Sequence, residues 1–134
     1  LRDLNGCFPA TEGPLAAAVR RGLGTESLAI VGEAREALAA GNRVRLGETL
    51  SEAQRVFDRL VAPACPELQA PHLHAVLDHG AVRELAHGGK GVGSQGDGCA
   101  QLLARGELER SQLAAELERG LGVRCLPLDL RSMD

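Results

Sequence analysis

The chain lacks tryptophan and tyrosine and has only two phenylalanines. Its core must therefore be built from leucine, alanine and valine, and it has no set of aromatic rings on which nucleic-acid bases could stack. The chain also has no excess of basic residues: it contains 15 Lys and Arg and 18 Asp and Glu, which gives a net charge of −3. No apolar run approaches the roughly 18 residues of a membrane span. These absences argue against a nucleic-acid or membrane partner.

Paired cysteines and metal-ligand spacings are also missing. The four cysteines, Cys7, Cys65, Cys99 and Cys125, are widely scattered and include no Cys-x-x-Cys pair. This pattern predicts small buried residues in a reducing cytoplasm rather than a zinc site or a disulfide framework. His72 and His79 can share a helical face, but no carboxylate or cysteine completes a ligand set, so we expect surface or helix-end histidines and no metal site.

What the 134 residues do contain is a helical pattern over the first half, in a length that suits one domain. Two helices are expected from Pro14 to Gly22–Gly24 and from Thr25 to Gly41. A third is expected where one apolar face recurs at three- and four-residue steps, a face that we interpret as core. That face consists of Leu46, Leu50, Ala53, Phe57 and Leu60. A proline-rich connector, Ala62–Ala70, precedes short helices that begin at Pro71 and near Val82.

The pattern changes in the second half. Cys99–Ala104 is a short apolar run of strand length, Glu107–Arg119 returns to helical spacing, and Val123–Leu130 is expected to be a closing strand. We therefore predict an α+β fold with helices packed on a small antiparallel sheet.

The most biased segment is Gly88–Gly98, with six glycines in eleven residues. We predict a loop between two short strands, and no packing pattern visible in the sequence accounts for its glycines. Because glycine permits positive φ and close approach of bare backbone, such a loop can turn its N–H groups toward an anion. The alternative is a tight turn, although six glycines exceed what a turn needs.

The spacing excludes three well-known phosphate-binding loops. A Walker A motif fails because Gly89-Lys90 is followed by Gly91. Gly91–Gly96 matches Gly-x-Gly-x-x-Gly, but no long helix follows it, as a dinucleotide-binding unit requires. A protein-kinase loop would carry valine two residues after its last glycine, where Gly98 stands.

The segment Gly88–Leu103 resembles the third conserved motif of the GHMP kinases (galactokinase, homoserine, mevalonate and phosphomevalonate kinases). Matching positions are Gly88, Lys90, Gly93, Gly96, Gly98 and Cys99. About 47 residues upstream, Ala40–Leu50 resembles the segment that opens the family's C-terminal domain, and Pro66-Glu67-Leu68 resembles the Pro-x-Leu between the two. The resemblance covers residues 28–130, with Gln95 and Asp97 in place of glycines and Val92 where threonine is common.

This resemblance implies that residues 1–134 are a single C-terminal domain with a ferredoxin-like fold. The activity it implies is transfer of a phosphoryl group from ATP, with Mg²⁺, to a hydroxyl of a sugar or related metabolite. The family's ATP loop belongs to an N-terminal domain, and Gly22-Leu23-Gly24-Thr25 does not match it. We expect the chain, which begins at Leu1 rather than Met, to be a fragment. On its own it would be inactive, bind neither ATP nor Mg²⁺ tightly, and contain no catalytic residue.

The expected substrate- or nucleotide-binding residues are Lys90, Gly91, Gly93, Ser94, Gln95, Gly96, Asp97 and Gly98. Lys90 would neutralise a phosphate or, alternatively, be solvated or paired. Asp97 would ligate Mg²⁺ or accept from a substrate hydroxyl, or it would cap the loop's own N–H groups. A carboxylate there repels phosphate unless a cation stands between them. The alternative function for the whole chain is a non-catalytic ligand-binding or regulatory module.

Overall fold

The computed structural model describes residues 13–93 and 96–128, and begins with one long helical segment. It consists of α2 (Pro14–Arg21), a π-helical turn (Gly22–Glu26) and α3 (Ser27–Ala39), which follow one another without a break. The expected helix end at Gly22 is wrong. Gly22 has helical φ and ψ of −63° and −45°, and a Cβ there would lie 2.9 Å from Leu60 Cβ and from Val61 Cγ2. The absence of a side chain at Gly22 therefore allows this helical segment to pack closely against the end of α4, at Leu60 and Val61.

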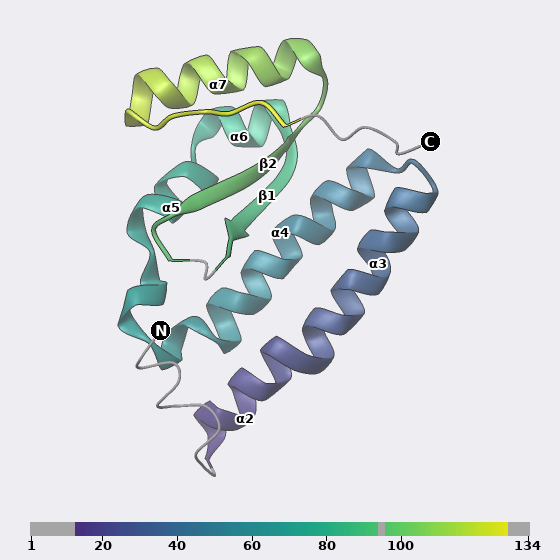
Figure 1. Cartoon of the computed structure of the whole chain (residues 1–134), viewed down its shortest axis with the longest axis vertical. Coiled ribbons are helices and arrows are strands. Elements are labelled where there is room, and N and C mark those ends of the chain that lie inside the picture. The colour runs from purple at the N-terminus through teal and green to yellow at the C-terminus, as the bar shows by residue number, and fades with distance from the viewer. Residues whose placement is uncertain (1–12, 94–95, 129–134) are drawn as a thin grey trace.

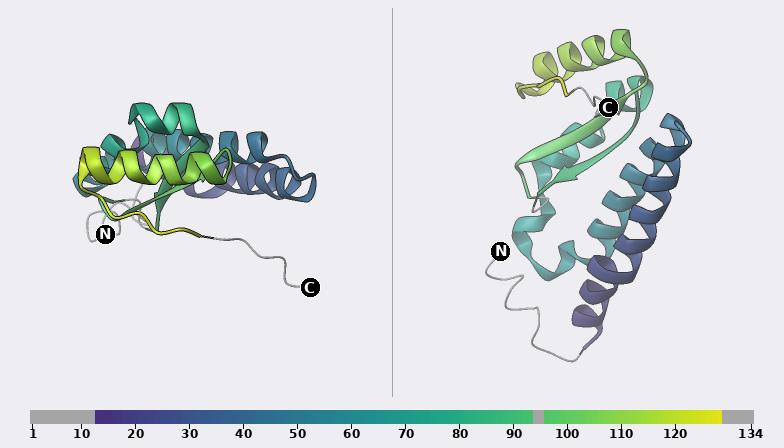
Figure 2. Two further views of the ribbon diagram at one scale, coloured as in Figure 1. Left: turned by 90° about the horizontal axis from the view of Figure 1, so that it is seen from above. Right: turned by 45° about the vertical axis from the view of Figure 1, so that its right-hand side comes forward.

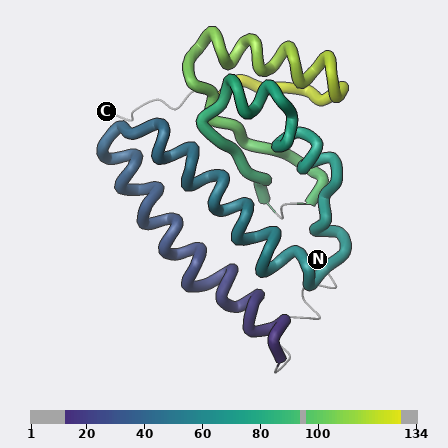
Figure 3. Tube along the Cα trace, turned by 180° about the vertical axis from the view of Figure 1, so that it is seen from behind, coloured from purple at the N-terminus to yellow at the C-terminus, as the bar shows by residue number. Residues whose placement is uncertain are grey.

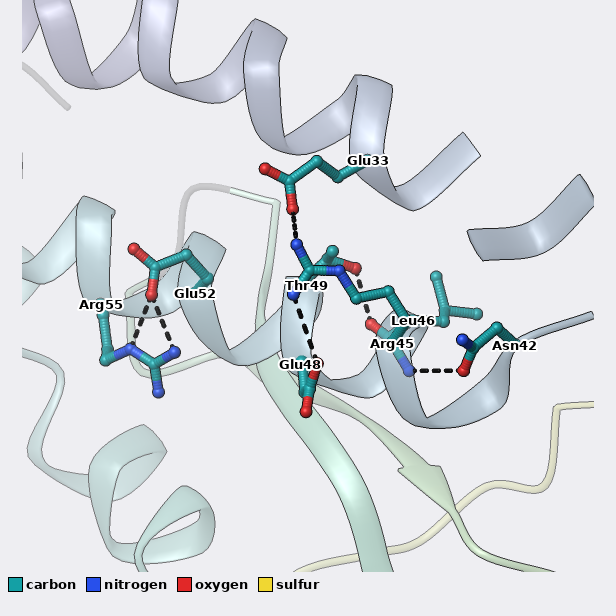
Figure 4. Close-up of polar contacts among 8 residues, drawn as sticks. All are labelled: Glu33, Asn42, Arg45, Leu46, Glu48, Thr49, Glu52 and Arg55. Atoms are coloured by element: carbon teal, nitrogen blue, oxygen red, sulfur yellow. Dashed lines mark hydrogen bonds and ion pairs between the residues drawn. The ribbon is translucent and has the colours of Figure 1, made fainter. Parts of the chain in front are cut away.

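A tight turn joins α3 to α4 (Arg43–Leu60), and the two helices run antiparallel side by side (Figures 1 and 3). Gly41 has a φ of 65°, the left-handed value expected at the end of a helix. Asn42 caps α4 by accepting from the Arg45 amide at 3.0 Å. The Arg45 guanidinium pairs with Glu33 on α3 and with Glu48 one turn along α4 (Figure 4). The turn and these contacts fix how the two helices pair.

The connector after α4 contains two 3₁₀ turns, Ala62–Ala64 and Pro66–Gln69, and leads to α5 (Pro71–Leu77) and α6 (Gly80–Leu85). Pro71 occupies the first turn of α5, as predicted. This connector is not a surface linker, because several of its residues pack with the end of α4 in a core cluster. That cluster consists of Val56, Leu60, Val61, Ala62, Cys65 and Leu68.

The sheet is a two-stranded antiparallel hairpin, β1 (Ala86–Val92) and β2 (Cys99–Ala104), followed by α7 (Glu107–Leu121). The register pairs Val92 with Cys99 and Gly88 with Leu103. β1 and β2 lie between α4 and α7, and this arrangement is visible in Figure 1 and in the right panel of Figure 2. The α+β prediction is confirmed: helices pack against a small antiparallel sheet.

A second core cluster lies between α6, the hairpin and α7, and is built from Val82, Ala86, Leu113 and Leu117. Both clusters consist of aliphatic side chains and one cysteine, as the scarcity of aromatic residues predicts. The expected closing strand is wrong for residues 123–128, which have no strand partner. Val123 and Cys125 still pack against the second cluster, and the Cys125 amide donates to Glu118 Oε1 at 2.9 Å. Residues 129 and 130 lie outside the described part.

Helix α4 is covered on two sides, by α3 and by β1. The expected single core face is therefore only partly right, because Leu60 is buried whereas Leu46, Leu50, Ala53 and Phe57 are half-buried. The other buried positions of α4 lie elsewhere around the helix and include polar residues; they are Gly47, Thr49, Gln54 and Val56.

Candidate functional site

The glycine-rich segment divides into a strand and a turn. Residues 88–92 belong to β1, so the expected loop over 88–98 is wrong for its first half, and the connection between the strands spans only residues 93–98. Gly93 has a φ of 69°, a left-handed conformation that favours glycine. Gly98 donates its amide to the carbonyl of Gly96 at 2.7 Å and closes the end of the turn. The expected site residues Ser94 and Gln95 lie outside the described residues.

The strand half contains glycine because β1 crosses α4 at backbone contact distance. A Cβ on Gly88 would stand 2.0 Å from the carbonyl oxygen of Gly47 on α4, and a Cβ on Gly47 would stand 2.4 Å from His87 Cβ. A Cβ on Gly89 would stand 2.4 Å from Leu102 Cδ2. Packing thus accounts for Gly88 and Gly89, contrary to the sequence-based interpretation. Gly47 and Gly88 belong to the two segments, Ala40–Leu50 and Gly88–Leu103, that carry the family resemblance. The sequence alone did not show that these two glycines are in contact.

Side chains of α4 bind the amides of β1. The Gly89 amide donates to Ser51 Oγ at 3.2 Å, and the buried Gly91 amide donates to Gln54 Oε1 at 2.7 Å. Two N–H groups of the glycine-rich segment are therefore already hydrogen-bonded within the chain. Sequence analysis missed Ser51 and Gln54. A usable signal was present, since Gly47, Ser51, Gln54 and Asp58 recur at four-, three- and four-residue steps and form one polar helix face.

The hydrogen bonds continue from Gln54 to α5. Gln54 Nε2 donates to Asp58 Oδ1 at 2.8 Å, and Asp58 Oδ2 lies 3.0 Å from His74 Nε2. His74 Nδ1 lies 2.9 Å from the Ala70 carbonyl oxygen. Both ring nitrogens thus face acceptors, an arrangement that the doubly protonated imidazolium satisfies. The hydrogen bond to Asp58 raises the pKa of His74, with a smaller contribution from Ala70, although partial burial acts in the opposite direction.

This engagement limits what His74 can do chemically. In the imidazolium form, in which both nitrogens donate, it has no lone pair with which to bind a metal ion or accept a proton. His79 acts at a helix end, where its Nδ1 accepts from the Ala81 amide at 3.2 Å. Within residues 13–93 and 96–128, no group of three or more His, Cys, Asp or Glu side chains is placed to hold a metal ion.

Asp97 fixes the turn to α5. Its exposed side chain accepts, through Oδ1, the amide of Leu73 at 3.0 Å. Leu73 is the third residue of α5, whose preceding residue, Ala70, supplies no side-chain cap. Asp97 therefore stabilises the amino end of α5, where a carboxylate is favourable. The structural alternative, a cap on the loop's own N–H groups, is thus replaced by a cap on α5, and the sequence contains no signal for a contact between residues 24 positions apart.

Lys90 and the cysteines differ in burial. Lys90 is half-buried in β1 and donates through Nζ to the Gly91 carbonyl at 2.6 Å, and desolvation lowers its pKa.

Cys65 is buried as expected, and its thiol donates to Glu67 at 2.8 Å. Cys99 is exposed where β2 begins, contrary to expectation, and Cys125 is half-buried. Cys7 lies outside the described residues.

Comparisons of the chain with protein-family models, curated proteins and solved structures find no match. In the part of the chain that the structure describes, no helix has both the length and the apolar content needed to cross a bilayer.

Proposed function

We propose that the chain is the C-terminal domain of a GHMP-type kinase, and that the turn over residues 93–98 forms one wall of its phosphoryl-transfer cleft. The observation that carries this proposal is the surroundings of Gly98. A Cβ there would meet no atom within 4 Å, and its φ is not in the left-handed region. Neither packing nor backbone conformation within the described residues requires glycine at this position. The bare backbone at Gly98 is open to a ligand or domain that approaches from outside, and its place beside the expected binding residues distinguishes it from open glycines elsewhere, such as Gly32.

The way in which the turn is held also supports the proposal. Phosphoryl transfer relies mainly on positioning and on charge stabilisation by groups that are already in place. The turn is fixed to α5 through Asp97, and β1 is fixed to α4 through Gln54. The strands that flank the turn are therefore held by the neighbouring helices, as a preorganised wall of a cleft must be.

The proposed fold is ferredoxin-like, with the order β-α-β-β-α-β. The described order β1–β2–α7 agrees with the β-β-α part of it. The donor would be ATP, and the acceptor a hydroxyl of a sugar-like metabolite. The described residues supply no ligand set for Mg²⁺, so the ion and the catalytic base would be held by an N-terminal ATP-binding domain of the same polypeptide. The present chain would limit water access and hold the substrate side of the cleft.

The test uses the full-length gene product with ATP and a panel of sugars and related alcohols, and compares Gly98→Val with Gly32→Val. Gly32 lies on α3, and a Cβ there also meets nothing within 4 Å. We expect Gly98→Val to reduce kcat/KM at least tenfold with an unchanged Tm, and Gly32→Val to leave activity unchanged. Equal activity of the two variants would refute the role of the turn, and absence of ATP-dependent phosphorylation would refute the kinase.

The isolated chain provides a second test. We expect calorimetry to show neither turnover nor strong ATP binding, because the donor site would lie in the other domain. Micromolar ATP affinity of residues 1–134 alone would contradict this division of the site.

A further inference from the structure

A pocket of about 450 Å³ lies between α4 on one side and α5 and α6 on the other. The backbone of Gly88 and Gly89 contributes to its lining, whereas none of the described turn residues, 93 and 96–98, does. It therefore lies at the opposite end of β1 from the proposed kinase cleft, and the inference below does not depend on the proposed function.

The pocket is lined by three arginines that come from different parts of the chain. Arg55 is on α4, Arg83 is on α6 and Arg105 directly follows β2. Arg55 is paired with Glu52 at 2.8 Å (Figure 4). Among the described residues, neither of the other two arginines forms an ion pair with a carboxylate. Two positive charges at this pocket therefore have no acidic partner.

Arg105 is held in place by backbone rather than by an acid. Its Nε donates to the Ala86 carbonyl at 3.2 Å, and its Nη2 donates to the Arg83 carbonyl at 3.2 Å. These bonds fix the guanidinium without neutralising it, so little conformational entropy remains to be lost when an anion binds. Of the two carboxylates among the lining residues, Asp58 is engaged by His74 and Gln54, and Asp78 forms no ion pair with Arg83 or Arg105 in the described part of the chain.

We propose that this pocket binds a small organic phosphate monoester. A dianionic phosphate matches two uncompensated guanidinium groups, and its oxygens suit their planar N–H forks. A carboxylate, with one charge, would leave one arginine unmatched. The body of the ligand would meet the Ser51 hydroxyl, which accepts from Gly89 and retains its own proton for donation. Leu77 and Val82 provide an apolar wall on the opposite side.

The test follows backbone amide signals of the chain by NMR during titration with glycerol 3-phosphate. We expect saturable shifts at the amides of Gly88 and Gly89, and at least about tenfold weaker binding by Arg83→Gln, the effect of losing one charge-assisted hydrogen bond. The matched control is Arg35→Gln, which removes the same charge from an exposed position on α3 outside the pocket. Its affinity should equal that of the unmodified chain. The Tm of each variant, measured alongside, identifies any loss of fold.

Two further ligands test the chemical class. Glycerol should not bind, and glycerate should bind at least tenfold more weakly than glycerol 3-phosphate. Equal binding of glycerate would overturn the phosphate assignment. Equal loss of affinity in Arg35→Gln and Arg83→Gln would show that binding depends only on the net charge of the chain, and would overturn the role of the pocket arginines. Shifts confined to residues 96–98 would place the phosphate at the turn, which overturns the pocket proposal and leaves the proposed kinase function standing. If no shift saturates below about 10 mM, the pocket proposal is refuted.

Discussion

Replacing Gly88 by alanine should destabilise the protein strongly, although it adds one methyl group. The new Cβ would stand 2.0 Å from the Gly47 carbonyl oxygen and 2.6 Å from Ser51 Oγ. The first of these atoms is backbone, so the contact cannot be relieved by a rotamer change, and β1 must move away from α4. Overpacking of this kind costs about 1–3 kcal/mol. Loss of the hydrogen bond between the Gly89 amide and Ser51 adds about 1 kcal/mol.

The expected total of about 3 kcal/mol corresponds to a fall in Tm of about 10 °C for a chain of this length. Calorimetry or thermal circular dichroism measures it. The matched control is Gly98→Ala, where the Cβ meets nothing within 4 Å, and we expect its Tm to change by less than about 2 °C. If the two alanine variants have the same Tm, the close α4–β1 contact does not explain the glycines of β1.

Three further substitutions test the polar contacts around the hairpin. For Asp58→Asn we expect stability, measured by urea unfolding, to depend less on pH. The pKa of His74 is raised in the folded state, so the contact between His74 and Asp58 contributes fully below a pH of about 6.5 and is lost as the pH rises through the folded-state pKa. An unchanged dependence of stability on pH would contradict this pairing. Gln54→Leu should cost about 1–3 kcal/mol in urea unfolding because it leaves the buried Gly91 amide without an acceptor, and a neutral result would show that water replaces the side chain. Asp97→Ala should cost about 1 kcal/mol and speed hydrogen exchange of the α5 amides selectively; uniform exchange across the chain would exclude the cap.

Local signals in the sequence predicted the elements that depend on local chemistry. β2 has the expected bounds, because a short apolar run ends there at Arg105-Gly106, and α7 extends two residues beyond the expected Arg119 to Leu121. α5 begins at Pro71 because proline suits the first turn of a helix. Each of these features is determined by residues within a few positions of one another.

The errors arose where a distant element decided the outcome. Glycine is a poor strand residue, and Gly88–Val92 nevertheless forms a strand, because α4 comes so close that any side chain at Gly88 would collide with it. Gly22 similarly indicated a helix end, and in the structure it provides space for the end of α4. At the candidate site, the Asp97 contact joins residues 24 positions apart, and the amide partners of β1 lie 37 and 38 positions away. A short-range pattern can indicate the polar face of α4, but it does not show which distant residues that face contacts.

The hydrogen bonds from β1 to α4 also determine how the sheet can grow. A strand whose outer amides are free is a template for pairing with another chain. In β1, two of these amides already donate to Ser51 and Gln54, so α4 closes that edge. Across the described residues, β2 pairs with β1 alone. Any further strand that joins this sheet, from this polypeptide or from another molecule, must therefore add beside β2.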